Sequence, residues 1–275
     1  MVSIAICTYN NARKLEAVLE SLQGLICPPA LEYELLVVDN NSRDETKAVV
    51  ERCQAVWGQR LRYIFERVQG LSHARNRALQ EAAGEIVSYI DDDVQVDPGW
   101  LAAVAAAFAE YPAAVVGGKS YRIYPSQRPA WLPEEYESLL SKLDYGDQVI
   151  VGLDKDLFGL NFSVRKERAV QVGGFDTSLG RCRHSLGSGE ESDLLRRIRE
   201  TGGLAVYEPR AIVGHVVPSE RVTELLQAPS RQIDSEATPE VVSTAPEVKD
   251  ASDTNHPSDP SGEERLPKEG GVRST

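Results

Sequence analysis

Three consecutive aspartates follow an apolar run in the stretch IVSYIDDDV, from Ile86 to Val94. The run has the β-branched and aromatic residues of a buried strand, so we expect Asp91, Asp92 and Asp93 to lie just past its carboxyl end. Open α/β sheets bind their ligands at this end. The three carboxylates repel one another. A hard divalent cation such as Mg²⁺ or Mn²⁺ would relieve that repulsion and keep coordination positions free for phosphate oxygens.

Both acidic clusters of the chain also have a purely structural interpretation. The aspartates fit a solvated acidic turn before a helix, with Asp97 as the N-cap and Pro98 as the first helical residue. Glu190 and Glu191 begin a second predicted helix, where acidic residues stabilise the first turn through the helix dipole. The residue types alone leave the structural and the chemical interpretations open.

A repeated order of strand, polar turn and helix positions the aspartates. The predicted strands are residues 2–7, 35–38, 63–65, 86–90 and 114–118, and the predicted helices begin at Asn10 or Asn11, after Ser42, at Ser72 and at Pro98. This alternation predicts a mostly parallel, Rossmann-like α/β sheet flanked by helices. Thr8, Asp39 and Asp91 would then share one rim of the sheet.

The pattern changes after residue 118. Residues 121–156 form an irregular stretch with many prolines and aromatics, in which Trp131 either stacks on a sugar or acceptor or covers the core. We expect further strands at residues 160–164, 204–207 and 211–217 and helices at residues 166 onward and 190–200. Residues 222–275 lack Phe, Tyr, Trp and Cys, so we predict a disordered acidic tail after a folded domain of residues 1–221.

Composition excludes several classes of protein. A net charge of -12 over 275 residues disfavours a nucleic-acid binder that tracks phosphates. The longest apolar stretch, residues 101–109, is about half of what spans a bilayer, and no leader sequence is recognisable. We therefore expect a cytoplasmic protein without a transmembrane segment, with peripheral association at the inner membrane face left open. The four scattered cysteines argue against a zinc site or a disulfide framework.

Taken together, the segments resemble the family 2 glycosyltransferases of the GT-A fold, which are inverting enzymes that use nucleotide sugars. The matching pieces, in order, are SIAICTYN, LLVVDNNSRDET, GLSHARNRAL, EIVSYIDDDVQVDPGWL, NFSVRKERAVQVGGFD, GEESDLLRRIRETGG and VYEPRAIVGHVVP. The resemblance implies that residues 1–118 form the nucleotide-binding half and residues 119–221 the half that holds the acceptor and the catalytic base.

The resemblance also implies roles for individual residues. The nucleotide-binding residues are Thr8, Tyr9, Asn10, Asp39, Arg75, Asp91 and Asp92. Asp93 would bind Mn²⁺ or Mg²⁺, with Asp91 and His215 as further ligands. A lone histidine in an apolar strand is equally typical of a core residue with a satisfied hydrogen bond, so two interpretations of His215 remain.

The base and the sugar pocket follow from the same resemblance. Glu191 matches the catalytic base, with Glu190 as the alternative. The family usually has Glu-Asp at this place, so Glu191 is one methylene longer than the residue it matches. Asn161 matches a Gly-x-Asn segment that faces the sugar or the acceptor, and Trp131 is assigned to the same pocket. Separately, we expect Arg181, Arg183 and His184, cations within a glycine-rich loop, to close over the diphosphate.

The predicted activity is a metal-dependent transfer of one sugar from a nucleotide-diphosphate donor, UDP-linked, to a saccharide or lipid-linked acceptor in polysaccharide or cell-surface glycan biosynthesis. The chain lacks the QxxRW segment of processive synthases, which favours single additions. Two alternatives are a nucleotidyltransferase and a non-catalytic module that binds nucleotide sugars or glycans. The first predicts a glycine-rich phosphate loop that is absent from residues 8–13, and only the unusual Glu191 favours the second.

Overall fold

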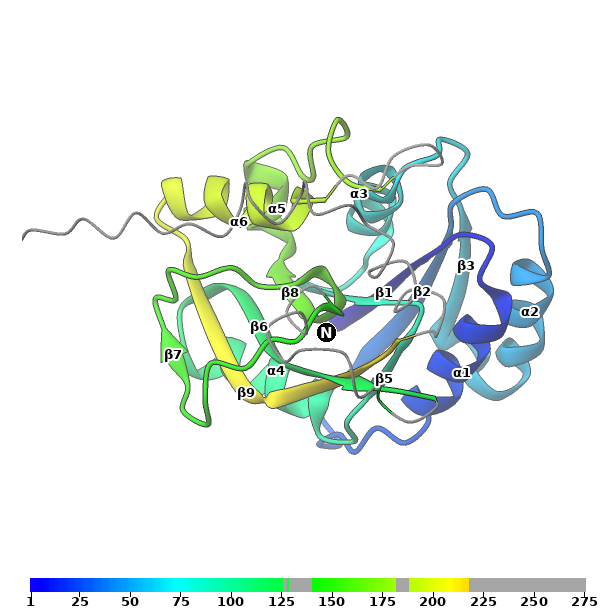
Figure 1. Ribbon diagram of the computed structural model, residues 1–275, viewed down its shortest axis with the longest axis horizontal. Coiled ribbons are helices and arrows are strands. Elements are labelled where there is room, and N and C mark those ends of the chain that lie inside the picture. The colour runs from blue at the N-terminus through cyan, green and yellow to red at the C-terminus, as the bar shows by residue number, and fades with distance from the viewer. Residues whose placement is uncertain (126–127, 129–139, 182–187, 218–275) are drawn as a thin grey trace, which may run out of the picture. The chain divides into compact units, whose positions relative to one another are not determined.

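A mixed sheet of nine strands lies between two layers of helices in residues 1–125, 128, 140–181 and 188–217, which are the residues that the computed structural model describes (Figure 1). The strand order is β3-β2-β1-β4-β8-β6-β9-β5, with β7 paired to β9. The predicted α/β sheet with flanking helices is confirmed. The predicted tail and Trp131 lie outside the described residues.

The first half of the sheet is parallel, as the alternation of strands and helices predicts. Its strands are β1 (Val2–Thr8), β2 (Tyr33–Asp39), β3 (Leu61–Phe65) and β4 (Ile86–Asp91). They are joined by the helices α1 (Ala12–Leu22), α2 (Thr46–Trp57), the short η1 (Gly58–Arg60) and α3 (Leu71–Glu81). The parallel pairing brings the carboxyl ends of β1, β2 and β4 to one edge of the sheet.

The second half of the sheet contains both parallel and antiparallel strands, and its strands β6 and β9 are longer than predicted. It contains β5 (Val94–Val96), α4 (Trp100–Glu110), β6 (Ala113–Ile123), β7 (Ile150–Val151), η3 (Gly159–Asn161), β8 (Phe162–Arg165), α5 (Lys166–Gln171), α6 (Glu190–Glu200) and β9 (Leu204–Val216). Strand β8 runs antiparallel to both of its neighbours, β4 and β6. It therefore links the parallel half to the part of the sheet that carries β9.

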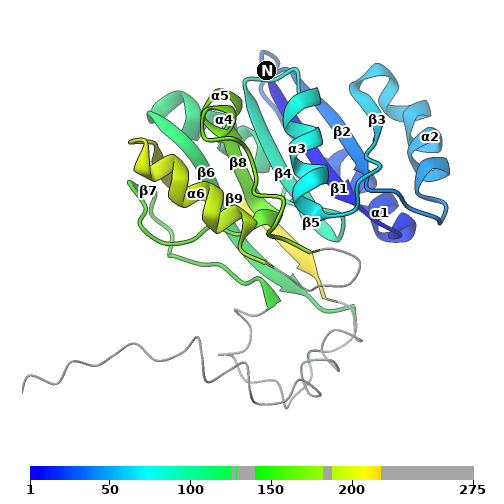
Figure 2. The same cartoon turned by 90° about the horizontal axis from the view of Figure 1, so that it is seen from above.

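The two helix layers bury separate cores. Helices α1, α2 and α4 cover one face with residues such as Leu15, Val50 and Trp100. Helices α3, α5 and α6 cover the other with residues such as Ala78 and Leu194. Figure 2 shows α3 and α6 on the same side of the sheet. The helix that carries Arg75 and the helix that carries the two glutamates therefore share one layer.

Strand β9 is continuous, where the sequence predicts two strands separated by Pro209. Both halves pair with β6, and a shift in register between Gly118 and Ser120 absorbs the extra residues. Gly118 permits this bulge because a Cβ at that position would overlap the carbonyl oxygen of Ala211. One strand thus runs from beside α6 to His215.

The turn after the aspartates also differs from the prediction. Residues 94–96 form β5, which pairs antiparallel with the end of β9, so a strand stands where a turn is expected. Helix α4 begins at Trp100, two residues later than the predicted start at Pro98. The Asp97 carboxylate accepts a hydrogen bond from the Gly99 N–H at 2.8 Å, but Gly99 holds the N-cap position.

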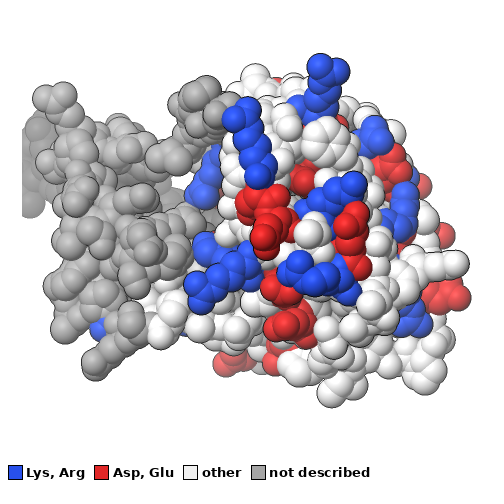
Figure 3. All heavy atoms as spheres, turned by 90° about the vertical axis from the view of Figure 1, so that its right-hand side faces the viewer, with Lys and Arg blue, Asp and Glu red and all other residues white. Residues whose placement is uncertain are grey.

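The described residues show the character of the helices, the state of three cysteines and part of the surface charge. None of their helices combines the length and the apolar character that a membrane crossing requires. Cys7, Cys27 and Cys53 are free thiols, and Cys182 lies outside the described residues. Basic and acidic side chains are interspersed on the face shown in Figure 3, so this face carries no continuous basic patch.

Candidate active site

The polar residues that end β1, β2 and β4 meet at the carboxyl rim of the sheet. Thr8 pairs with Asp39 in the register of β1 and β2, and Asp91 pairs with the residue before Thr8. Thr8 and Asp39 are buried, whereas Tyr9 is partly exposed. The order of strands therefore places the three polar ends side by side, as the parallel sheet predicts.

The three consecutive carboxylates point toward different partners. Asp92 accepts hydrogen bonds from the Thr8 hydroxyl at 2.5 Å and from the Asn11 amide at 2.7 Å. The side chain of Asp91 is 41% exposed, against 14% for Asp93. Asn11 is the N-cap residue of α1 but makes no capping hydrogen bond with its side chain, because that side chain binds Asp92 instead.

Burial and mutual repulsion raise the energy of the ionised aspartates. Burial, and after it the Asp93 carboxylate, raise the pKa of Asp92 to about 7, against the opposing effect of the hydrogen bonds from Thr8 and Asn11. A nearby cation would favour the ionised form of all three carboxylates. The cluster could therefore hold a cation.

Asp93 faces a buried histidine from the opposite end of the chain. His215 is 2% exposed, and its Nδ1 lies 2.9 Å from the carbonyl oxygen of Leu140. A carbonyl only accepts hydrogen bonds, so Nδ1 carries the proton and Nε2 keeps its lone pair in the neutral ring. Nε2 lies 3.5 Å from Asp93 Oδ1, and Lys14 Nζ lies 3.5 Å from Asp93 Oδ2.

The facing atoms of Asp93 and His215 fit a divalent cation. Two ligands at about 2.1 Å from one ion are roughly 3.0 to 3.5 Å apart when the angle between them is 90° to 110°. The hydrogen bond at Nδ1 is the kind that fixes a ligating histidine. Within the described ranges no three His, Cys, Asp or Glu residues cluster closely enough to hold a metal by themselves. The protein would therefore share the ion with other oxygen atoms.

The two glutamates at the start of α6 differ in their contacts. Glu190 is 3% exposed, and its Oε1 accepts a hydrogen bond from Arg75 Nη1 at 2.6 Å. Glu191 Oε1 accepts a hydrogen bond from the Gly159 N–H at 3.0 Å, and Oε2 lies 3.4 Å from the same Arg75 nitrogen. The side chain of Glu191 is 18% exposed against 4% for Glu190. Glu191 is thus the more accessible of the pair.

The pKa shifts separate the glutamates in the same sense. Burial alone would raise the pKa of Glu191, but Arg75 and the Gly159 N–H outweigh it and hold the pKa below the ordinary value. Burial raises the pKa of Glu190, Arg75 opposes the shift, and Glu191 adds to it. The lowered pKa favours the ionised form of Glu191, which is the form in which a carboxylate can act as a general base.

Asp39 lies in a network that the sequence does not reveal. Its carboxylate accepts hydrogen bonds from the Tyr63 hydroxyl at 2.6 Å and from the Ser42 N–H at 2.8 Å. Asn10, which has a positive φ of 50°, accepts a hydrogen bond from the Arg43 N–H at 2.7 Å. The loops after β1 and β2 are thereby tied together beside Asp39. Tyr63 is the functional candidate that sequence reasoning missed, since only its place in β3 brings it here.

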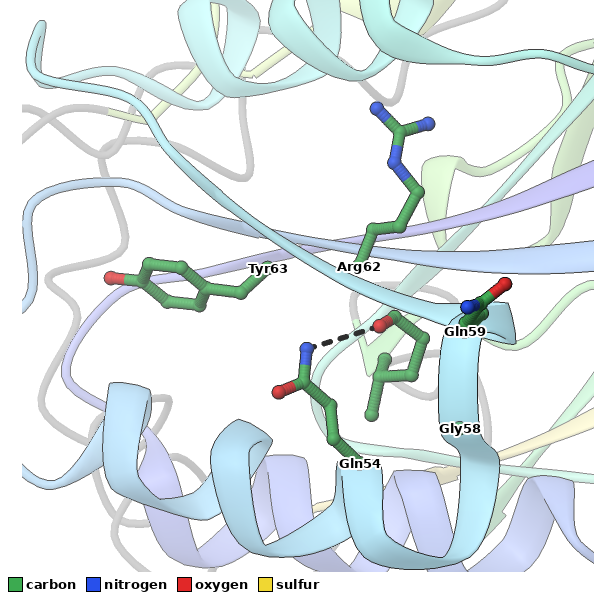
Figure 4. Close-up of a pocket in the computed structure, with 6 residues that line it drawn as sticks. Gln54, Gly58, Gln59, Arg62 and Tyr63 are labelled. Atoms are coloured by element: carbon green, nitrogen blue, oxygen red, sulfur yellow. Dashed lines mark hydrogen bonds between the residues drawn. The ribbon is translucent and has the colours of Figure 1, made fainter.

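A hollow in the surface near β3 shares Tyr63 with this site. It lies between the end of α2 and β3 and is lined by Gln54, Gly58, Gln59, Leu61, Arg62 and Tyr63 (Figure 4). Gln54 closes part of it by donating a hydrogen bond to the Leu61 carbonyl at 3.1 Å. The hollow contains none of the clustered carboxylates, so we do not assign it a catalytic role.

The chain matches a model of one protein family over most of its folded part. The model described as "Glycosyl transferase family 2" matches residues 3–170, which is more than half of the chain. The chain belongs to glycosyl transferase family 2. The match includes the strands from β1 to β8 and the aspartate triad, whereas α6 and β9 follow it.

Named relatives of this glycosyltransferase come from an archaeon and a bacterium. The glucosyl-dolichyl phosphate glucuronosyltransferase of Haloferax volcanii is 26% identical over 219 residues, which cover 78% of this chain and 68% of that protein. The succinoglycan biosynthesis protein ExoM of Rhizobium meliloti is 26% identical over 224 residues, which cover 81% of this chain and 69% of that protein.

A solved structure supports the fold. The mannosyltransferase PcManGT from Pyrobaculum calidifontis, in complex with GDP-Man and Mn²⁺, is similar with a TM-score of 0.59 and 25% identity. The similarity covers 79% of this chain but only 57% of the mannosyltransferase. The predicted GT-A fold and the assignment as a glycosyltransferase are confirmed by these comparisons.

The remaining predicted site residues of the glycosyltransferase occupy different settings. Asn161 is 3% exposed, and its amide oxygen accepts a hydrogen bond from Trp100 Nε1 at 2.9 Å. Its amide nitrogen donates to the carbonyl oxygens of Ala211 at 2.8 Å and Lys119 at 3.3 Å. The side chain therefore fastens α4 to β6 and β9, and its role toward a sugar stays a prediction.

Part of the predicted loop over the diphosphate can be placed. The Arg181 carbonyl accepts a hydrogen bond from the Leu71 N–H at 2.9 Å, which attaches residue 181 to the start of α3. Arg183 and His184 lie outside the described residues. The predicted closure over the diphosphate stays a prediction.

Replacing Asn161 by alanine should lower the free energy of unfolding by about 2 kcal/mol or more, because it leaves the buried Trp100 N–H and the Ala211 carbonyl without partners. Urea unfolding followed by tryptophan fluorescence measures the change. The exposed Gln80→Ala variant on α3 is the control, with an expected change below about 0.5 kcal/mol. An equal effect of both substitutions would contradict the structural role of Asn161.

Proposed function

We propose that this glycosyltransferase moves a single sugar from a UDP-linked donor to a saccharide or lipid-linked acceptor, with inversion and with Mn²⁺ or Mg²⁺ as cofactor. The observation that carries the proposal is the pair of facing metal-ligand atoms, Asp93 Oδ1 and His215 Nε2, 3.5 Å apart at the carboxyl rim of the sheet. The proposal extends the family assignment to a cofactor, a donor and a stereochemical course.

Asp93 and His215 are the proposed protein ligands of the cation, with Asp91 beside them. When bound, the cation supplies charge neutralisation for the leaving diphosphate. Asp92 has its carboxylate oriented by Thr8 and Asn11, so it shapes the wall of the pocket. PcManGT was solved with Mn²⁺, which supports a divalent cation in this fold.

The loops after β1 and β2 are the proposed nucleotide pocket, with Thr8, Tyr9, Asn10 and Asp39 as its residues. Asp39 accepts one hydrogen bond at each oxygen and keeps acceptor capacity for an N–H of the base or a hydroxyl of the ribose. The hydrogen bond from Tyr63 orients the carboxylate and thereby sets the direction of its free lone pairs. The carboxylate is thus prepared for a donor group of the nucleoside.

Glu191 is the proposed base. Its carboxylate takes the proton from an acceptor hydroxyl while the hydroxyl oxygen forms a bond to the anomeric carbon. The bond between that carbon and the diphosphate oxygen breaks on the opposite face of the sugar, and the nucleoside diphosphate leaves. The ionised, partly exposed state of Glu191 supports this assignment over Glu190.

The names of two relatives support the proposed acceptor class. One acts as a glucosyl-dolichyl phosphate glucuronosyltransferase and the other is named for succinoglycan biosynthesis. We therefore place this protein in the synthesis of a polysaccharide or a lipid-linked glycan. The described residues contain no helix that could span a membrane.

A thermal-shift screen with UDP- and GDP-sugars, each with MnCl₂ or with EDTA, tests the proposal. We expect one nucleotide to raise the melting temperature only when Mn²⁺ is present, because a ligand bound by the folded state alone stabilises that state. Release of the nucleoside diphosphate from the same sugar should also require Mn²⁺. Equal shifts with EDTA would contradict metal dependence, and binding without release would favour the non-catalytic module.

A further inference from the structure

Arg75 joins three acidic residues from two different elements. Its side chain projects from α3 and is 4% exposed. Nη1 lies 2.6 Å from Glu190 Oε1 and 3.4 Å from Glu191 Oε2, and Nη2 lies 3.7 Å from Asp91 Oδ1. A single guanidinium therefore links the end of β4 to the start of α6.

The groups around the Arg75 guanidinium restrict it to a single position. A Cβ on Gly159 would overlap the guanidinium, so the glycine gives Arg75 its space. The Phe175 ring lies on another side, with its centroid 5.5 Å from Arg75 Cζ. The backbone carbonyl of Arg75 is held by the Tyr89 hydroxyl at 3.0 Å. Arg75 is thus a rigid part of the site.

The charges around Arg75 do not balance. One guanidinium faces three acidic side chains, and Glu190 Oε2 is buried without a hydrogen-bond partner within the described residues. Excess buried acidity costs folding free energy. Such arrangements gather where a site needs particular carboxylates held in particular places.

We propose that Arg75 is a positioning residue for Glu191 and acts on sugar transfer through that carboxylate without touching the donor. This inference rests on the proposed function, and it departs from the place near the nucleotide that the family resemblance implies. Gly159 contributes to the same positioning, because its N–H donates a hydrogen bond to Glu191 Oε1 while Arg75 faces Oε2.

Contacts to both carboxylate oxygens of Glu191 explain how a glutamate can act as the base where the family usually has aspartate. A glutamate has one more rotatable bond, so its carboxylate samples more positions unless both oxygens are restrained. The contacts from Gly159 and Arg75 supply that restraint at 3.0 Å and 3.4 Å. The same guanidinium also faces Asp91, so it fixes the position of Glu191 relative to the aspartates of the proposed donor site.

An Arg75→Lys variant tests the inference. Lysine keeps the charge but cannot face Glu190, Glu191 and Asp91 together, because it lacks the planar fork of the guanidinium. For the nucleotide sugar that the wild type hydrolyses fastest with Mn²⁺, we expect kcat to fall by about 30-fold or more and KM to stay within about threefold. Calorimetric titration with UDP and Mn²⁺ should give a Kd within the same limit. Arg77→Lys, a half-exposed arginine of the same helix, is the matched control and should behave as wild type.

A second variant covers the case in which Arg75→Lys does not fold, as judged by its thermal melt. Gly159→Ala keeps every charge and displaces the guanidinium, so the same loss of kcat with an unchanged Kd is expected. A tenfold rise in KM or Kd with kcat retained would identify Arg75 as a donor contact and overturn the inference alone. A wild type that turns over no nucleotide sugar would overturn the proposed function and this inference with it.

Discussion

Asp93→Asn protein is expected to lose Mn²⁺-dependent turnover of the nucleotide sugar by about 100-fold or more while remaining folded. The substitution keeps the size of the side chain and removes the negative charge that faces His215 Nε2 at 3.5 Å. Turnover is measured as release of the nucleoside diphosphate over a range of MnCl₂ concentrations. Binding of Mn²⁺ in the presence of UDP is followed separately by the electron paramagnetic resonance signal of the free ion.

Asp97→Asn is the matched control for Asp93→Asn. Asp97 follows the same turn and binds the Gly99 N–H, but it lies beyond β5. We expect its turnover and Mn²⁺ affinity to match the wild type. Full activity of Asp93→Asn with the wild-type dependence on Mn²⁺ would remove Asp93 from the metal site and leave the proposed cofactor without its main ligand.

Glu191→Gln should lower kcat by about 10²- to 10⁴-fold with little change in the affinity for UDP and Mn²⁺. Glutamine keeps the shape and can still accept the Gly159 N–H, but it cannot take a proton from the acceptor hydroxyl. The measurement is kcat and KM for the donor, with the Kd from calorimetry. The separation of kcat from binding identifies a group that acts in the transition state.

Two further variants interpret the Glu191 result. Glu190→Gln removes the negative charge and the proton-accepting carboxylate that face Arg75, so it tests the alternative base. A larger loss of kcat in Glu190→Gln than in Glu191→Gln would reverse our assignment. Glu191→Asp keeps the charge, but the shorter side chain falls away from the Gly159 N–H, so we expect an intermediate loss of kcat.

The parallel half of the fold could be read from local patterns. Each strand from β1 to β4 is an apolar run that ends in polar residues, and each following helix has one apolar face, so the shared rim of Thr8, Asp39 and Asp91 follows from the order of elements. Helix α6 has the predicted bounds because its first residue follows Gly189, which has a left-handed φ of 95°, and Gly202 and Gly203 follow its end.

The second half could not be read in the same way because tertiary pairing decided its local structure. The three residues of β5 are too few for a periodic signal and become a strand only through pairing with β9.

Side-chain contacts between distant residues could not be predicted in either half. Asn11 has the pattern of a capping residue, yet its side chain is bound to Asp92. The contacts of Tyr63 with Asp39 and of Gly159 with Arg75 join residues far apart in the sequence, and no spacing predicts them.

The aspartate turn is completed by a segment that leaves the ribosome last among the strands. Val94 pairs with His215, and the Val216 N–H donates to the Asp93 carbonyl oxygen at 2.9 Å. During synthesis, β1 to β4 emerge early, but this turn stays open on one side until residues 213–216 arrive. A fragment that stops after residue 118 would lack both His215 and the pairing of β5 with β9. The aspartate turn and the end of β9 that carries His215 are therefore completed together.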